Sequence, residues 1–259
     1  MTTLNDDFAT ENVKSIFASL KINDYKYLSI GLLGSAFALN MQLIAQGWMV
    51  YEMTSSAMKL TWVTLSFMIP QVAFSLLGGV LADRFAKKPI IGWAPFVNGL
   101  ATLAMALIIF SGKADFSTFL AIGFLNGTIL ALSMPARTAF IPEVVGEGLI
   151  FNAMAFNSAC WNLARIVGPA AAGFIIAIFA KGNTTSGYGV GLVYVILSLL
   201  YFISALSVLY ISHPGQPVQR KKRSALKDTQ EALKYVINSP IIGGLIILSI
   251  LPFLFGLSI

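Results

Sequence analysis

The stretch from Leu60 to Ser111 reads LTWVTLSFMIPQVAFSLLGGVLADRFAKKPIIGWAPFVNGLATLAMALIIFS. It consists of two apolar runs, Leu60–Ala82 and Pro89–Ser111, and its charged residues all lie in the turn between them. Each run has roughly the 20 residues that an α-helix needs to cross the hydrocarbon core of a bilayer. Because a helix satisfies its own backbone hydrogen bonds, it can cross lipid where an open strand cannot. The stretch therefore predicts two antiparallel membrane-spanning helices joined by a charged turn at one surface.

The same pattern recurs on both sides of this pair. A seventh apolar run begins near Ile241 and continues to the end of the sequence without a polar cap, which indicates a fragment of a longer protein. The other apolar runs are Tyr27–Val50, Phe116–Ala136, Asn152–Ala180 and Tyr188–Ile211.

These runs predict an all-α integral membrane protein whose partner is the lipid bilayer. Short connections indicate that consecutive helices are antiparallel neighbours. The expected organisation is a cytoplasmic tail over residues 1–26, a six-helix bundle over 27–211, a cytoplasmic linker over 212–240 and a truncated seventh helix over 241–259.

The composition excludes several classes of function. With 57% hydrophobic and 11% charged residues, the chain is far from a soluble domain, in which about a quarter of residues are charged. A single cysteine, Cys160, and a single histidine, His213, supply neither a disulfide framework nor a metal site. The net charge of +6 is dispersed between apolar runs, which argues against a nucleic-acid partner. We expect no enzyme, no metal and no cofactor.

The distribution of lysine and arginine predicts the orientation. Thirteen of the 17 basic residues lie in the tail, the linker and the two connections on the same side, whereas Lys59, Lys113 and Lys181 lie on the other side. Arg165 falls within a span. Because basic residues concentrate on the cytoplasmic side of membrane proteins, the N-terminus is predicted to be cytoplasmic.

Polar residues fall on one face of four spans at helical spacing. They either hydrogen-bond between helices, at about 0.6 kcal/mol each, or line a cavity that water and a small-molecule substrate enter. The recurrence on four helices favours the cavity, with Gln42, Gln46, Asn126, Ser133 and Arg165 as its lining. The four faces are Gly31, Ser35, Gln42 and Gln46; Thr64, Gln71, Ser75 and Gly78; Asn126, Ser133 and Arg137; and Ser158, Asn162, Arg165 and Pro169.

Arg165 is the charged residue deepest in a span. A buried guanidinium without partners is costly in lipid, so we expect it to face the bundle interior and to find acceptors on Asn162, Gln42 or a backbone carbonyl. No aspartate or glutamate lies near the middle of a complete span, so this half lacks an obvious proton-carrying carboxylate.

Glycine and proline interrupt two of the runs. Gly168, Pro169 and Gly173 predict a break in the fifth span, and Pro70 with Gly78 and Gly79 predicts a similar break in the second. The alternative is close packing of small residues between helices.

The charged turn Gly79-Val80-Leu81-Ala82-Asp83-Arg84-Phe85-Ala86-Lys87-Lys88 resembles the signature of the major facilitator superfamily, G-x-L-A-D-R/K-x-G-R/K-R/K, with Ala86 in place of a glycine. This resemblance implies a twelve-helix fold of two halves, each built from 3+3 inverted repeats, with this chain as the N-terminal half. It also implies a gating latch. The residues assigned to that latch are Gly79, Asp83, Arg84, Lys87, Lys88 and the neighbouring Arg137.

The fifth span is similar to the antiporter motif of the same superfamily, G-x-x-x-G-P-x-x-G-G, with Ala164 and Ala172 replacing two glycines. Together with Pro135-Ala136-Arg137 and Ile141-Pro142-Glu143, it resembles the bacterial efflux subgroup that includes the enterobactin exporter. In the fourth span, Gly123 stands where many proton-coupled drug exporters have the arginine of R-x-x-Q-G.

These resemblances imply an alternating-access exporter of the bacterial inner membrane, driven by protons, that moves a siderophore- or drug-like molecule. Its missing C-terminal half would complete the site. The alternatives are an uptake permease of the same superfamily, a membrane-embedded enzyme and a non-transporting scaffold. The enzyme would need convergent nucleophile, base or metal ligands, and the sequence shows none of these patterns.

Overall fold

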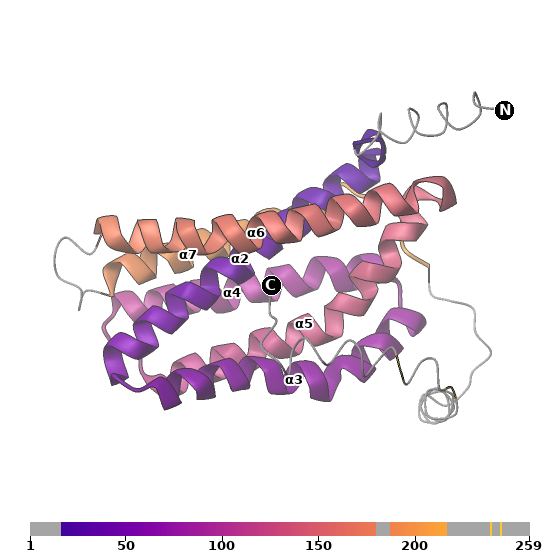
Figure 1. Cartoon of the computed structure of the whole chain (residues 1–259). Coiled ribbons are helices and arrows are strands. Elements are labelled where there is room, and N and C mark those ends of the chain that lie inside the picture. The colour runs from indigo at the N-terminus through magenta and orange to yellow at the C-terminus, as the bar shows by residue number, and fades with distance from the viewer. Residues whose placement is uncertain (1–16, 180–186, 217–238, 240–243, 245–259) are drawn as a thin grey trace. The chain divides into compact units, whose positions relative to one another are not determined.

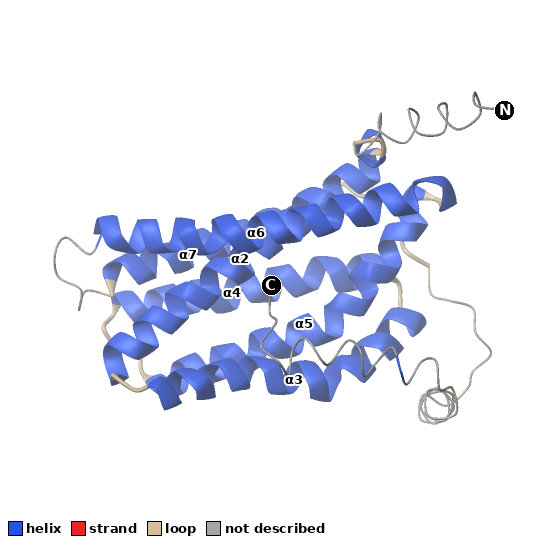
Figure 2. Ribbon diagram, in the orientation of Figure 1, coloured by secondary structure: helices blue, strands red, loops and turns tan. Residues whose placement is uncertain are grey.

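The computed structural model describes residues 17–179 and 187–216, together with Ser239 and Gly244. Within this part of the chain the structure is helical and contains no strand (Figures 1 and 2). Two short 3₁₀ helices, η1 (Ser19–Lys21) and η2 (Glu147–Leu149), accompany the long ones. The long helices are α2 (Asn23–Thr54), α3 (Ala57–Arg84), α4 (Lys87–Phe110), α5 (Phe116–Val145), α6 (Ile150–Phe179) and α7 (Tyr188–Leu209).

Six of these helices are long and apolar enough to cross a membrane, with mean hydropathy between 1.6 and 2.4 in their most apolar stretches. The predicted all-α membrane fold is confirmed. α2, α3 and α5 extend beyond the predicted spans, and α5 continues to Val145 instead of stopping at Ala136, whereas α7 ends at Leu209, two residues before the predicted end. Hydropathy marks the lipid-embedded part of a helix, whereas backbone hydrogen bonding continues until Gly146, whose φ of 71° ends the helix.

The predicted tail, linker and seventh helix fall largely outside the described residues. Of the tail, only Phe17–Lys26 is described, and its last four residues already belong to α2. Of the linker, Ser212–Gln216 and Ser239 are described, and of the seventh helix only Gly244.

The helices pack in a pattern that repeats itself. α3 packs against α5 and α2 against α6, while α7 contacts both α2 and α4, and α4 contacts α5. Exchanging α2 with α5, α3 with α6 and α4 with α7 turns the α3–α5 pair into α2–α6 and the α2–α7 pair into α4–α5, and leaves the α4–α7 pair unchanged. This is the packing expected of two three-helix units in 3+3 inverted repeat.

The backbones of α3 and α5 touch. A Cβ atom added to Gly78 would lie 2.1 Å from the carbonyl oxygen of Ala131, and one added to Gly127 would lie 2.1 Å from that of Phe67. No side chain fits at such distances, so glycine is required at both crossings. Between membrane helices, where lipid is as apolar as the interface, close backbone approach of this kind drives association.

The two ends of the bundle differ in charge. At one end α2, α4 and α6 begin and α3, α5 and α7 end, and the described basic residues Lys21, Lys26, Arg84, Lys87 and Lys88 lie there. We call this the lysine-rich end. There Tyr25 of α2 donates a hydrogen bond to the carbonyl oxygen of Ala153 in α6, at 2.7 Å. The opposite end carries Lys59 and Lys113.

Candidate functional site

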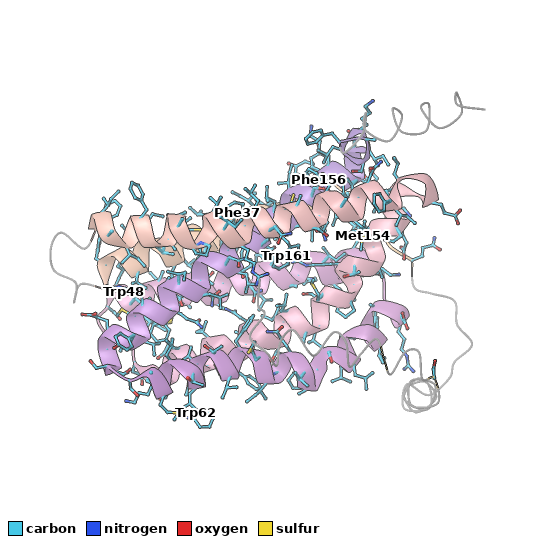
Figure 3. The ribbon with its side chains drawn as sticks, viewed as in Figure 1. Phe37, Trp48, Trp62, Met154, Phe156 and Trp161 are labelled. Carbon is cyan, nitrogen blue, oxygen red and sulfur yellow. The ribbon has the colours of Figure 1, made fainter. Side chains whose placement is uncertain are left out.

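A cavity of about 840 Å³ opens where α2, α3, α5 and α6 meet. Its walls are mainly apolar, with Phe67 on α3, Leu39 on α2 and Trp161 on α6, the last labelled in Figure 3. Its polar groups come from Gln71 and Ser75, one turn apart on α3, and from Thr138 on α5.

These polar side chains are anchored on their own helices. The amide of Gln71 donates to the carbonyl oxygen of Phe67 at 3.2 Å, and the hydroxyls of Ser75 and Thr138 donate to Val72 and Met134 at 3.0 and 3.1 Å. Each hydroxyl proton is therefore used, and the oxygen lone pairs remain available as acceptors. The cavity combines an aromatic wall with fixed acceptors, which suits an amphipathic organic molecule.

The predicted polar stripe on α3 contributes two residues to this cavity, but four predicted lining residues do not line it. Gln42, Gln46, Asn126 and Ser133 are between 2% and 4% exposed and lie inside the bundle. Helical periodicity shows that a polar face exists, but it does not show whether that face meets a cavity or a neighbouring helix. These four side chains lie between helices, although the side-chain oxygen of Gln42 and both side-chain polar atoms of Asn126 have no hydrogen-bond partner among the described residues.

Arg165 was predicted to face the bundle interior, but it does not lie in the interior of these six helices. Its side chain is exposed on α6, one turn beyond Trp161. The inner face of α6 carries the small residues Ala164, Gly168 and Ala172, all of them buried. A Cβ atom on Gly168 would lie 3.1 Å from the Cβ of Asn40 in α2, so this interface leaves no space for a guanidinium.

The predicted helix break at Gly168, Pro169 and Gly173 is also absent. α6 is a continuous helix from Ile150 to Phe179, and α3 is likewise continuous through Pro70. Membrane helices tolerate proline because neighbouring groups satisfy the freed carbonyl. Gly168 serves the close approach to α2, whereas a Cβ on Gly173 would meet nothing within 4 Å.

Arg137, and not Arg165, is the enclosed arginine. Its Nη2 donates to the hydroxyl of Ser35 at 3.4 Å, Ser35 lies 2.7 Å from the hydroxyl of Ser204, and Ser204 donates to the carbonyl oxygen of Gly31 at 2.6 Å. This sequence of hydrogen bonds joins α5, α2 and α7. Arg137 therefore donates within the bundle to Ser35 and not to Asp83 in this conformation, and its place in the latch stays a prediction.

The superfamily signature lies at the lysine-rich end. Asp83 and Arg84 are exposed at the end of α3, whereas Lys87 is only 1% exposed at the start of α4. The Nζ of Lys87 forms an ion pair with Glu143 of α5 at 2.7 Å. Glu143 is a site residue that the sequence reasoning missed, although Ile141-Pro142-Glu143 had been noted as part of a resemblance.

Both lysines of the signature also hold the segment that leaves α7, Ser212–Gln216, which we call the exit segment. Lys87 donates from its Nζ to the carbonyl oxygen of Gln216 at 2.7 Å and from its backbone nitrogen to that of Gly215 at 2.9 Å. Lys88 donates from its backbone nitrogen to the carbonyl oxygen of Pro214 at 3.4 Å, and from its Nζ to that of Ile211, directly before the segment. Asp24 of α2 accepts from the backbone nitrogens of Ser212 and His213 at 2.9 and 2.8 Å.

Two departures from the superfamily patterns have a structural reason. Ala86 has φ −59° and ψ 133°, a conformation open to any residue, so the signature turn does not need its usual glycine here. At Gly123 an added Cβ would lie 2.5 Å from the hydroxyl oxygen of Ser66 in α3. An arginine at that position would force α3 and α5 apart.

Residues 14–259 match the family described as "Transmembrane secretion effector", a family of the major facilitator superfamily. The chain belongs to this family. As a member of it, the chain is one part of a multi-pass membrane transporter fold, in agreement with the six spans and the signature turn.

Three curated relatives show what the chain is similar to. It is 27% identical over 225 residues to the enterobactin exporter EntS of Citrobacter koseri, an overlap of 85% of this chain and 49% of the relative. The enterobactin exporters EntS of Shigella boydii and Escherichia coli are 25% identical over the same shares. The chain thus spans about half the length of the curated relatives it matches.

Proposed function

We propose that this chain forms the N-terminal half of an alternating-access exporter for a small organic molecule of siderophore- or drug-like chemistry. The observation that carries the proposal is the cavity between α2, α3, α5 and α6, in which Gln71 and Ser75 meet the aromatic side chains of Phe67 and Trp161. Family membership and the name of the relatives support export over uptake.

The second half of the transporter covers the open faces of α3 and α6. In their most apolar stretches only 17% and 22% of the residues are buried, against 67% in α2. Arg165 lies on the open face of α6, and a guanidinium facing lipid is strongly disfavoured. This face therefore meets protein or the water of the substrate pathway, where Arg165 is available to an anionic group.

The lysine-rich end is the cytoplasmic end in a bacterial inner membrane, as the bias of basic residues supports. There Lys87 and Glu143 fix the turn between α3 and α4, while Asp83 and Arg84 remain exposed. Asp83 acts as the latch by engaging the second half in one state and releasing it in the other.

Export is coupled to protons. The described residues that line the cavity include no aspartate or glutamate, and the effect of a protonophore on transport tests the coupling.

Transport into inverted membrane vesicles tests this function. Vesicles from cells that produce the complete transporter are given a pH gradient, acid inside, and a labelled catecholate siderophore. We expect uptake that a protonophore abolishes and that Gln71→Ala with Ser75→Ala lowers about tenfold, since two lost hydrogen bonds of about 0.7 kcal/mol each amount to a factor of ten. Thr61→Ala, on the same helix but outside the cavity, serves as the matched control.

Two outcomes would overturn the proposal. Movement of substrate only into right-side-out vesicles would identify an uptake permease. No transport of siderophores, drugs or sugars, together with a co-purifying hydrolytic activity, would identify an enzyme.

A further inference from the structure

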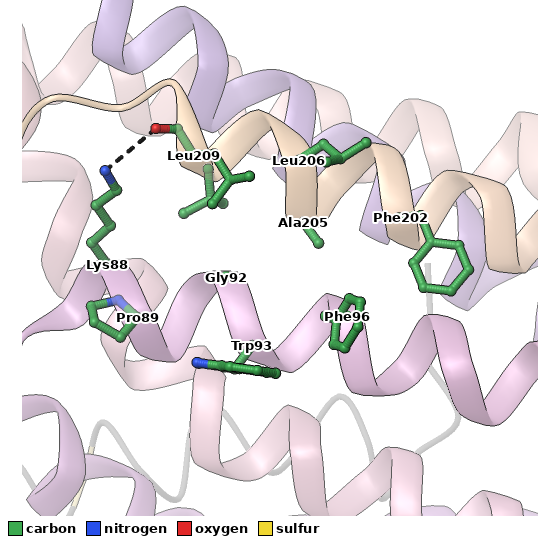
Figure 4. A pocket seen from close by; sticks show the side chains of 10 residues that line it. Lys88, Pro89, Gly92, Trp93, Phe96, Phe202, Ala205, Leu206 and Leu209 are labelled. Atoms are coloured by element: carbon green, nitrogen blue, oxygen red, sulfur yellow. Dashed lines mark hydrogen bonds between the residues drawn. The ribbon is translucent and has the colours of Figure 1, made fainter.

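A second hollow lies outside the candidate site, between α4 and α7 (Figure 4). Its volume is about 590 Å³, and Gly92 on α4 and Ala205 on α7 leave the space. Trp93 and Phe96 from α4 and Phe202 from α7 form its aromatic walls. We call it the α4–α7 groove.

The groove is apolar along its length and basic at one end. Lys88, at the lysine-rich end, is the charged residue among the described residues that line it. Figure 4 shows its ammonium group directed toward the end of α7, where it donates to the carbonyl oxygens of Leu209 and Ile211. An ammonium group has three hydrogens, so one remains for a further acceptor.

The surroundings of the groove are apolar. Trp93 and Leu209 are 64% and 69% exposed, and both belong to helices that span the membrane. α4 and α7 contribute no residue to the polar cavity. The groove therefore opens on an apolar side of the bundle, where lipid is the solvent, and Trp93 lies about 1.5 turns from Lys88, a spacing typical of the bilayer interface.

We infer that the α4–α7 groove binds an anionic phospholipid from the leaflet at the lysine-rich end, with an acyl chain in the groove and the phosphate beside the ammonium group of Lys88. The choice of occupant rests on charge complementarity. An apolar groove that ends at the ammonium group of Lys88 fits an acyl chain that ends in a phosphate. The inference rests on the six spans and not on the direction of transport.

Quenching of Trp93 fluorescence tests the inference. The full-length protein and its Trp93→Phe variant are reconstituted in phosphatidylcholine bilayers that contain the same mole fraction of either brominated phosphatidylglycerol or brominated phosphatidylcholine. The difference between the two proteins isolates Trp93 from the other three tryptophans. We expect an apparent affinity about fivefold higher for phosphatidylglycerol, the factor that corresponds to about 1 kcal/mol per lysine near an anionic surface.

Four variants make the result specific. Lys88→Gln removes the preference, Lys88→Arg keeps it, and Lys113→Gln at the opposite end leaves it unchanged. Ala205→Phe fills the groove and lowers the quenching by both lipids, while circular dichroism verifies that the helices are intact.

Other results would overturn the inference. Equal quenching by both lipids would mean that the groove holds ordinary boundary lipid, and a preference that survives Lys88→Gln would place the headgroup elsewhere. Absence of quenching by either lipid would mean that protein, a second half or another copy, covers the groove.

Discussion

Arg137 and Arg165 carry the same charge within neighbouring helices and occupy opposite environments. Arg137 is enclosed by α2, α5 and α7 and donates to Ser35, whereas Arg165 is exposed on α6. The difference comes from the residues beside them. Ala164, Gly168 and Ala172 occupy the inner face of α6 and bring it against α2, which turns Arg165 outward.

Enclosed and exposed charges also lie side by side in the sequence at the lysine-rich end. Lys87 is enclosed and paired with Glu143, while Asp83, four residues earlier, is exposed. Enclosed charges thus join helices within this bundle, and exposed charges remain available to another surface. Five predictions test this division, in order of decreasing expected effect.

The first prediction moves the arginine side chain from the exposed face of α6 to its buried face. Ala164→Arg places a large cation in the α2–α6 interface, where Ala164 is completely buried, and we expect no folded bundle. The measurement is the yield of monodisperse protein in detergent. Arg165→Ala, the adjacent control, should keep the yield of the unchanged protein; an equal loss in both variants would contradict the assignment of the two faces.

Removing the partner of an enclosed charge comes next. Glu143→Gln leaves Lys87 buried without a carboxylate and should lower the free energy of unfolding by about 3 kcal/mol. Thermal unfolding in detergent measures the loss. Lys87→Met combined with Glu143→Gln should recover much of it, because the unpaired charge is gone; a double variant less stable than Glu143→Gln would speak against the ion pair.

Changing an exposed charge should affect transport instead of stability. Asp83→Asn is expected to lower transport about tenfold, which corresponds to a coupling free energy of about 1.4 kcal/mol between the two states. Its melting temperature should remain that of the unchanged protein. Asp83→Glu, which keeps the charge, should retain most of the transport, and full transport by Asp83→Asn would rule out the latch.

Arg137 tests whether an enclosed cation is needed for the fold. Its Nε is buried without a hydrogen-bond partner among the described residues, so its desolvation is poorly compensated. Arg137→Met, of similar length and without the charge, should change the free energy of unfolding by less than about 1 kcal/mol or increase it. Chemical denaturation measures the change, and a loss of about 3 kcal/mol would show that the hydrogen bonds through Ser35 stabilise the bundle.

The smallest effect concerns a charge fully in water. The hydroxyl and backbone N–H of Thr118 donate to Asp115, which precedes α5, and these bonds lower the pKa of its carboxyl. Because the folded pKa lies below the unfolded one, the stabilisation is present above about pH 4 and is lost as the pH falls through the folded pKa. Asp115→Ala should flatten the acid limb of the stability curve slightly, and an unchanged limb would contradict this cap.

Hydropathy and the signature turn predicted the six spans and the superfamily because both depend on local composition. The polar face of α3 was also predicted, and it contributes Gln71 and Ser75 to the cavity. Trp161 was missed, although it lies one turn before Arg165 and helical spacing would have placed it on the same face.

Other features depend on contacts between distant segments. A polar stripe does not identify its neighbour, so Gln42 and Asn126 were assigned to a cavity and lie between helices. Arg165 was expected to turn inward because a guanidinium is costly in lipid. The small residues on the opposite face of α6 pack against α2 instead and turn Arg165 outward. The pair of Lys87 and Glu143 joins two helices that no local pattern connects.

The contacts of the exit segment also determine which helices would bear a force that pulls on the chain. After α7 the chain is tethered at Ile211, Gly215 and Gln216 by the two lysines at the start of α4, and Lys87 is in turn clamped to α5. Tension applied to the chain beyond Gln216 would therefore be borne first by α4 and α5, and only afterwards by α7. A pulling force on the chain beyond Gln216 would thus reach the signature turn at the start of α4 before it reached the body of α7.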